Sequence, residues 1–363
     1  MTPFEAVPAT FPVFGQGLIN CTAANANSGR FVNFYETVGL KRSSIKILIK
    51  ITIMKAVRIH EFGDPEKVLK LEATEVPIPK EDEVLIKVYA SAVNPVDQKI
   101  ITGQAQEKFP STFPLTIGWD VAGIIEQAGS HVRNFSIGDE VYGRPFPTTN
   151  GAFAEYLVIK ADEVALKPRS LDHLNAAAVP LAGLTAWQGL FKFGKLEKGQ
   201  RVLIHAASGG VGSFAVQFAK WKGAYVIGTA SADNLAFIKQ LGADDAIDYQ
   251  NERFEERLSD IDLVIDLIGK ETQERSLEVI KPGGRLVTTV MPEFKEKAKE
   301  KGIHLEGFTA QSYKDDLEQI ADLIDDGIVS PVVSAVYDLE DAVKAEALSA
   351  QKHTRGKIVI KVV

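Results

Sequence analysis

The sequence contains a single cysteine, Cys21, among 363 residues, which excludes an internal disulfide and a zinc site built from several thiolates. It also has no excess of positive charge. Its 41 Lys and Arg against 48 Asp and Glu give a formal net charge of −7, which argues against a nucleic-acid partner. No apolar run is long enough to span a membrane. We therefore expect a cytoplasmic globular protein, long enough for two domains.

Residues 1–53 differ in composition from the rest of the chain. Pro3, Pro8 and Pro12 precede a basic, isoleucine-rich run that ends at Met54. Three explanations stay open: a natural extension that is disordered or dispensable, an organelle-targeting segment, or a start upstream of the true one. The segment has few acids, as a transit peptide would, but it has few arginines and no clear amphipathic helix. We favour a dispensable extension.

Residues 201–220 have the pattern of a strand, a glycine turn and a helix. A short apolar run, Val202–Ile204, precedes the turn, and apolar residues recur at helical spacing after it. Such a turn lets the backbone approach a pyrophosphate, and the helix start offers unpaired N–H groups to its charge. Ala207 replaces the first glycine of the common G-x-G-x-x-G pattern. We predict a dinucleotide site at Ser208, Gly209, Gly210, Val211 and Gly212, the alternative being a turn that only allows close packing.

The end of the next expected strand, residues 225–228, indicates which cofactor this site takes. An NAD site places Asp or Glu there to bind the ribose 2′-hydroxyl, whereas this sequence has no acid before Asp233. Thr229 and Ser231 leave room for a 2′-phosphate and can donate hydrogen bonds to it, so the sequence favours NADP(H). No Lys or Arg stands in the adjacent loop, and Ser231 could instead be a helix N-cap.

The order of expected elements divides the chain after residue 53 into two domains. Residues 54–182 contain short strand candidates at close spacing, which is typical of a mostly-β domain. Residues 183–311 alternate strands with helices, which predicts a doubly wound parallel sheet covered on both faces. The last strand, 357–362, is expected to rejoin the first domain, so we assign residues 312–363 to it. The overall class is α/β.

From Met54 onward the chain resembles the zinc-independent medium-chain dehydrogenase/reductase superfamily, in its quinone oxidoreductase and alkenal (enone) reductase branch. Eight motifs carry the resemblance, in the order of that family: SAVNPVDQK (91–99), PLTIGWDVAG (114–123), GDEVY (138–142), GAFAEY (151–156), PLAGLTAWQGL (180–190), AASGGVG (206–212), LGADDAIDY (241–249) and HTRGKIVI (353–360). The resemblance implies a GroES-like catalytic domain and a Rossmann NADP-binding domain. It also implies a homodimer and an enzyme that passes hydride from NADPH to a small quinone, enone or enal.

The sequence departs from the zinc-dependent members of that superfamily at their metal ligands. Asn94 stands in place of a cysteine, and Trp119 and Asp120 stand in place of a His-Glu pair. These residues cannot form a tetrahedral zinc site, so we expect no metal. Without a Lewis acid an alkoxide is poorly stabilised, whereas an enolate or hydroquinone anion is delocalised. A reductase is therefore expected; a trans-2-enoyl thioester reductase and a crystallin-like NADPH-binding protein without turnover stay open as alternatives.

Further site residues follow from the resemblance alone. Asn94 and Thr185 match positions beside the nicotinamide and are assigned to both catalysis and cofactor binding, with Lys357 and Tyr249 as additional cofactor residues. Lys99 could polarise the substrate carbonyl as a catalytic group. Each has an ordinary structural alternative: turn chemistry for the Asn-Pro-Val-Asp segment, a backbone-bonded hydroxyl for Thr185, a surface lysine for Lys99 and a strand-end aromatic for Tyr249.

The substrate pocket is predicted from aromatic residues of the first domain. Trp119, Phe146 and Phe153 lie within or near the matching motifs and could line an apolar pocket. Most aromatic residues of a globular chain pack in its core, which is the alternative for these three.

Overall fold

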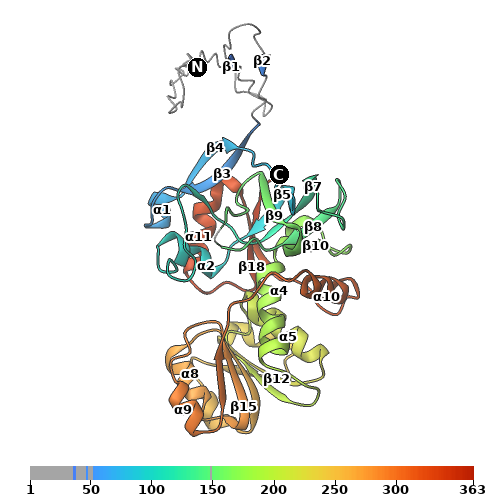
Figure 1. Cartoon of the computed structure of the whole chain (residues 1–363). Helices are drawn as coiled ribbons and strands as arrows, with labels where there is room; N and C mark the ends of the chain where they lie inside the picture. Colours follow the sequence, from blue (N-terminus) through green and yellow to red (C-terminus); the bar gives the residue numbers. More distant parts are fainter. Residues whose placement is uncertain (1–35, 38–45, 48–51, 148) are drawn as a thin grey trace.

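The computed structural model describes residues 36–37, 46–47, 52–147 and 149–363. Two short strands, β1 (Glu36–Thr37) and β2 (Lys46–Ile47), pair antiparallel; the prediction of a dispensable extension over residues 1–53 otherwise lies outside the described residues. From residue 52 the chain forms two bodies that meet at α4 and β18 (Figure 1). No helix in these ranges is long and apolar enough to cross a membrane.

The first body contains a seven-stranded sheet in which β10, β8, β7, β5, β18 and β17 are neighbours in that order and β9 also pairs with β5. Its strands are β5 (Glu83–Ala92), β7 (Val121–Ala128), β8 (Glu140–Gly143), β9 (Tyr156–Lys160), β10 (Val164–Leu166), β17 (Val333–Asp338) and β18 (Lys357–Lys361). The final strand thus pairs antiparallel with β5, near the start of the domain. The chain leaves this sheet, builds the second body, and returns.

A smaller sheet and four helices complete the first body. The sheet has the order β4-β3-β6, formed by β4 (Lys70–Glu75), β3 (Ile53–Ile59) and β6 (Leu115–Thr116). The helices are α1 (Pro65–Val68), α2 (Pro95–Ile101), α3 (His173–Ala177) and α11 (Ala342–Ala350). Helix α11 packs on both α2 and β18, so residues from the two ends of the described chain share one core.

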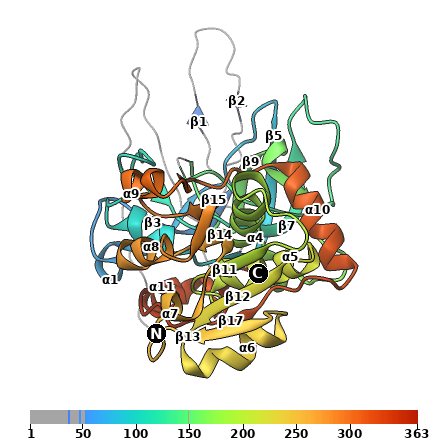
Figure 2. The same cartoon turned by 90° about the horizontal axis from the view of Figure 1, so that it is seen from below.

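The second body is a six-stranded parallel sheet of order β13-β12-β11-β14-β15-β16, the Rossmann arrangement. Its strands are β11 (Arg201–Ile204), β12 (Tyr225–Ala230), β13 (Asp245–Asp248), β14 (Ile261–Asp266), β15 (Ile280–Thr288) and β16 (His304–Gly307). The crossing helices are α5 (Gly210–Trp221), α6 (Leu235–Gln240), α7 (Phe254–Arg257), α8 (Lys270–Ser276) and α9 (Lys295–Glu300). They cover both faces of the sheet (Figure 2).

Neighbouring residues of the central strands point into two different cores. Leu203 and Val264 pack with the helices α7 to α9, whereas Ile204 and Leu263 pack with α4 and α5 on the opposite face. This accounts for the continuous apolar runs in these strands, because a sheet covered on both faces has no solvent side.

Two helices tie the bodies together. Helix α4 (Pro180–Trp187) continues as a π-helical segment, Gln188–Phe193, and α10 (Lys314–Asp325) follows the Rossmann domain. The Gln188 side chain donates to Gln311 O at 2.9 Å and accepts from Gln311 N at 2.9 Å. Arg144 Nη1 donates to Ala310 O at 2.9 Å. The chain that leaves the Rossmann domain is thus bound on both sides of the domain junction.

The Asn-Pro-Val-Asp segment begins a helix, where the sequence indicated only a turn. Asn94 is the N-cap of α2, Pro95 is its first residue, and Asp97 Oδ2 accepts a hydrogen bond from Asn94 N at 2.7 Å. A proline at the first helical position and an acid at the third are both favourable there.

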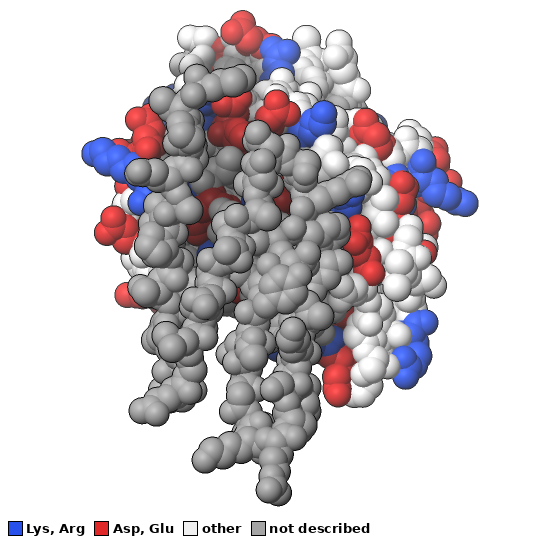
Figure 3. Space-filling model, turned by 90° about the horizontal axis from the view of Figure 1, so that it is seen from above, with Lys and Arg blue, Asp and Glu red and all other residues white. Residues whose placement is uncertain are grey.

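On the face drawn in Figure 3, the described acidic and basic side chains are interspersed and form no patch of one sign.

Candidate active site

The glycine turn follows β11 directly, and its shape depends on glycine at one position above all. A Cβ on Gly212 would lie 2.2 Å from Ala206 O, far inside van der Waals contact. Helix α5 therefore starts closely packed on the strand end, with Gly209 as its N-cap and its first N–H groups directed at the turn. Ala206 has a φ of 50°, a left-handed conformation that normally favours glycine.

The C-terminal segment of the chain lies across this turn. Gly356 N donates to Ser208 O at 2.9 Å, and Gly209 and Gly356 form an isolated parallel bridge. A Cβ on Gly210 would lie 2.9 Å from Lys357 Cδ, so the lysine stem passes over the start of α5. The structure thus brings Lys357 to the predicted cofactor turn.

A buried polar cluster lies where Lys357 ends. Its ammonium donates to Val93 O at 2.9 Å, to Asp120 Oδ2 at 3.1 Å and to Asn94 Oδ1. Asn94 Nδ2 donates to the same Asp120 oxygen at 2.8 Å. All three side chains are buried: Lys357 is 5% exposed, Asn94 is 1% exposed and Asp120 is 0% exposed. The Lys357 ammonium and the Asp120 carboxylate are therefore compensated by each other rather than by water.

Asp120 connects this cluster to the helix that carries Thr185. Its Oδ1 accepts from Leu181 N at 2.6 Å, in the first turn of α4. One turn later, Thr185 Oγ1 donates to Leu181 O at 2.6 Å, and the side chain is nearly buried. Four separate parts of the sequence therefore meet at this site. Asp120 binds Asn94, Lys357 and the first turn of the helix that carries Thr185, and the Lys357 stem connects them to the glycine turn.

The predicted ribose-phosphate residues lie at the end of β12. Thr229 is buried, and its hydroxyl bonds His205 Nδ1 at 3.1 Å, while His205 Nε2 bonds Ser276 Oγ at 2.9 Å. Burial lowers the pKa of His205 to about 4, so the ring is neutral. Ser231 Oγ accepts from Asn234 Nδ2 at 2.9 Å. Thr229 supports the sheet end, and Ser231 is the more accessible of the two hydroxyls.

Tyr249 lies beside the same strand end. Its N–H donates to Ala230 O at 3.2 Å, and its side chain is 51% exposed. An exposed aromatic ring at this edge of a Rossmann sheet is suited to contact a nucleotide rather than to fill a core.

Arg355 is a cofactor candidate that the sequence reasoning missed. Its Nη2 donates to Asp233 O at 2.6 Å and its Nε donates to Asn234 Oδ1, so the guanidinium lies on the loop that follows β12. The loop itself contains no Lys or Arg, but the side chain of Arg355 binds Asn234, from which it is separated by 121 residues in the sequence. The HTRGK motif contained this arginine, yet only the fold shows where it lies.

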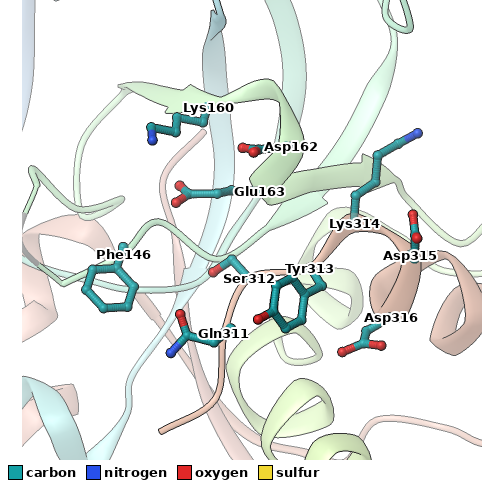
Figure 4. A pocket seen from close by; sticks show the side chains of 10 residues that line it. All are labelled: Phe146, Lys160, Asp162, Glu163, Gln311, Ser312, Tyr313, Lys314, Asp315 and Asp316. Atoms are coloured by element: carbon teal, nitrogen blue, oxygen red, sulfur yellow. The ribbon is translucent and has the colours of Figure 1, made fainter.

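The predicted pocket aromatics lie in different places. Trp119 and Phe153 are both 0% exposed and pack in the core of the first domain, so they offer no surface to a substrate in this structure. Phe146 lines a cavity of about 430 Å³ between the first domain and the segment before α10 (Figure 4). Its other lining residues are polar: Lys160, Asp162, Glu163, Gln311, Ser312, Tyr313, Lys314, Asp315 and Asp316. Lys99 is exposed on α2.

A Rossmann sheet with a glycine turn, joined to a mostly-β domain that closes over it, defines a two-domain dehydrogenase or reductase. Comparison with known sequences agrees: the profile of the alcohol dehydrogenase GroES-like domain matches residues 80–169, and that of zinc-binding dehydrogenases matches residues 241–360.

Individual relatives indicate to which branch of the family the chain belongs. The chain is 33% identical to a mitochondrial NAD(P)H oxidoreductase of Danio rerio, over 86% of this chain and 92% of that one. It is 36% identical to the chloroplastic NADPH-dependent alkenal/one oxidoreductase of Arabidopsis thaliana, over 85% and 79%. The quinone oxidoreductase structure of Coxiella burnetii superposes with a TM-score of 0.81, 36% identity and coverage of 86% and 100%. The chain belongs to the medium-chain dehydrogenase/reductase superfamily, in its quinone and alkenal oxidoreductase branch.

The residues at the turn fit the cofactor of this family. The first turn of α5 offers backbone N–H donors suited to a pyrophosphate, Arg355 adds a cation at the loop that follows β12, and Tyr249 presents an exposed ring beside the same strand end. The protein is an NADPH-dependent oxidoreductase.

Proposed function

We propose that the protein reduces a quinone or the C=C bond of an α,β-unsaturated carbonyl, with NADPH as the hydride donor and without zinc. The observation that carries the proposal is the Lys357 ammonium between Asn94 and Asp120. A cation already neutralises the one carboxylate of this cluster, and a divalent metal there would face the ammonium at close range. Asn94 uses its amide to bind Asp120 and Lys357, so its donors and acceptor are engaged.

NADPH, when bound, supplies the hydride. The chain contributes positioning: the glycine turn and Arg355 hold the two phosphate regions, and Thr185 and Asn94 form a rigid wall linked through Asp120. Binding the reactants in a fixed orientation can supply about 7–11 kcal/mol of the barrier reduction. Lys99 is the proposed carbonyl-polarising group, because an ammonium near the developing oxyanion stabilises it.

The cavity at Phe146 is the proposed route for the acceptor. Four acids and two lysines line it, so its charge does not favour a substrate with several phosphates. This supports a small enone or quinone over the thioester alternative, in which a phosphate-bearing carrier must bind. Phe146 itself supplies the apolar contact, with Phe109 packed edge-on at 5.8 Å.

The test follows NADPH oxidation with a small enone, 9,10-phenanthrenequinone and crotonyl-CoA. We expect turnover with the first two and little with the thioester. Preference for the thioester would support the alternative reductase, and inertness towards all three with NADPH still bound would indicate a binding protein. Lys99→Met should lower kcat for the enone, and Lys70→Met, at an exposed position of β4, is its control; an unchanged kcat in the first variant removes the polarising role.

A homodimer is part of the proposal. Strand β16 is at one edge of the six-stranded sheet, with β15 as its neighbour, and an edge strand offers unpaired N–H and C=O groups to a second copy. Phe308 N donates to Thr288 O of β15 at 3.1 Å, so the N–H of the preceding residue, Gly307, points away from β15. Gly307→Pro should remove this donor from the edge and shift the mass measured by light scattering from dimer to monomer. The cytoplasmic location stays a prediction, since two relatives bear mitochondrial and chloroplastic names.

A further inference from the structure

Two buried carboxyl groups lie next to the site and play no part in the function proposed above. Asp97 of α2 is 0% exposed and Glu346 of α11 is also 0% exposed. Helix α11 packs on α2, and Gln98 Nε2 of α2 donates to Glu346 O at 3.3 Å, so the Glu346 carboxyl and the Asp97 side chain are neighbours in this interface. Asp97 Oδ1 and both Glu346 oxygens have no hydrogen-bond donor in the described part of the chain.

Too few cations lie near Asp97 and Glu346 in the described part of the chain for both carboxyls to be ionised. Among residues 52–147 and 149–363, Lys357 is the one buried cation that acts on these two carboxyls, and its protons go to Val93 O, Asn94 Oδ1 and Asp120 Oδ2. Two carboxylates in contact in a water-free region would repel strongly. If one of them holds a proton, it can donate to the other, which satisfies an oxygen that otherwise has no partner.

The surroundings add no further compensating charge. Among the described residues, the charged groups that act on Asp97 are Lys357, Asp120 and Glu346, and those that act on Glu346 are Lys357 and Asp97, so Lys357 supplies the positive charge to both. Tyr337 of β17 is partly buried against the same core. The remaining groups on these elements are exposed or half-exposed: Asp64, Glu66, Lys67, Lys99, Asp338, Glu340, Asp341, Lys344 and Lys361.

We infer that Asp97 and Glu346 share one proton as a carboxylic acid–carboxylate pair, and that this pair positions Asn94 in the active site. The link is direct, because Asp97 Oδ2 accepts the Asn94 backbone N–H at 2.7 Å, and the Asn94 side chain binds Lys357 and Asp120. Gln98 Nε2 also donates to Glu346 O at 3.3 Å, which fixes α11 against α2. Both residues are positioning residues; the inference rests on the proposed role of Asn94.

The pair should make stability depend on pH. Burial raises the pKa of Asp97 from 3.8 to about 8 and raises that of Glu346 well above 4.5. Between about pH 4 and 8 the folded protein then holds a proton that the unfolded chain has lost, so stability falls as the pH rises. For one proton, the unfolding constant rises by up to about tenfold per pH unit.

The experiment compares Glu346→Gln, which keeps a donor but cannot titrate, with Glu346→Ala, which loses the donor. Infrared spectra of the wild type should show a buried protonated carboxyl that is absent from both Glu346→Gln and Asp97→Asn. Glu163→Gln is the control, because burial raises the pKa of Glu163 to about 7 and its signal is independent of the pair. Glu346→Gln should also remove much of the loss of Tm between pH 5 and 8.

The positioning role is measured on NADPH binding. Glu346→Ala should raise the Kd and KM for NADPH about tenfold, and Glu346→Gln should restore them to within about twofold. A protonated-carboxyl signal that persists in both Glu346→Gln and Asp97→Asn when each is combined with Glu163→Gln would overturn the shared proton. An unchanged NADPH Kd in a folded Glu346→Ala protein would overturn the positioning role. Absence of enone turnover in every protein would instead count against the proposed function, because the infrared and binding readouts do not need it.

Discussion

Lys357 and Asp120 form an ion pair of 3.1 Å between two buried side chains that are 237 residues apart in the sequence. The pair joins the last strand of the chain to the loop after β6. It also keeps Asn94 hydrogen-bonded from both sides. The arrangement makes Lys357 a residue of both the fold and the site.

Replacing Lys357 with Met should therefore destabilise the protein by about 3–5 kcal/mol, because it leaves the Asp120 carboxylate buried without a cation. Urea denaturation measures this loss. Lys361→Met on the same strand is the matched control, since Lys361 is exposed and its substitution should change stability by less than about 0.5 kcal/mol. Equal effects in the two variants would contradict a special role for the ammonium.

Gly212→Ala should weaken NADPH binding by displacing the start of α5. The added Cβ would meet Ala206 O at 2.2 Å, and this atom belongs to the backbone and cannot move aside cheaply. We expect a lower Tm as well as a higher Kd for NADPH. At Gly209 the nearest atom to an added Cβ is 3.4 Å away and φ is −77°, so Gly209→Ala should fold with an unchanged Tm. A normal Tm for both variants would argue against close packing at Gly212.

Ala206→Gly should stabilise the protein. Ala206 has a φ of 50°, and the left-handed region costs a non-glycine residue about 1–2 kcal/mol. Glycine loses more backbone entropy on folding, roughly 0.5–1 kcal/mol, so a net gain of up to about 1 kcal/mol is expected in the free energy of unfolding. Ala207 has no positive φ, so Ala207→Gly relieves no strain and should lower stability. The opposite order of the two variants would refute the strain at Ala206.

Arg355→Met should reduce the preference for NADPH over NADH. A charged hydrogen bond to the 2′-phosphate is worth about 1.5–3 kcal/mol, so KM for NADPH should rise about 10- to 100-fold while KM for NADH changes little. Steady-state kinetics with both cofactors measure the ratio. A parallel rise in both KM values would show that Arg355 only holds the loop at Asp233 and Asn234.

His205 should make the protein less stable in acid. Burial lowers its pKa from 6.5 to about 4, so between these values the unfolded chain binds a proton that the folded protein does not. The contribution of His205 to stability is therefore complete above about pH 6.5 and declines as the pH falls towards 4, opposite in sign to the contribution of the Asp97–Glu346 pair over the same range. His205→Gln should flatten this part of the Tm profile. A profile identical to that of the wild type would show that other groups cause the acid loss.

The sequence predicted local features well, because strand, turn and helix signals act over a few residues. The glycine turn after a strand and the parallel sheet covered on both faces appear as expected. The last strand was expected to rejoin the first domain, and it pairs with β5. The edge strand β16 and the strand β17 were not predicted, since their exposed or half-exposed residues carry no continuous apolar run. The start of α2 was missed because proline and asparagine serve turns and N-caps alike.

The arrangement of the site could not be predicted from the sequence, because it depends on contacts between residues that are far apart along the chain. Asn94 and Lys357 were named separately, but nothing local indicates that one ammonium binds Asn94 and Asp120 together. Arg355 was overlooked because only residues adjacent to Ser231 were considered. Trp119 and Phe153 carry the same apolar surface whether they line a pocket or fill a core, and the structure places both in the core.

The position of β18 has a consequence for synthesis of the protein. This strand, Lys357–Lys361, lies between β5 and β17 in the sheet but follows the whole Rossmann domain in the sequence. During translation Ala90–Ala92 of β5 must therefore remain without their β18 partner until the whole Rossmann domain has been made, although Glu83–Lys87 can already pair with β9. The nascent chain should consequently need protection from aggregation, and deletion of its last seven residues, 357–363, should leave the Rossmann sheet able to form but the first domain unable to close.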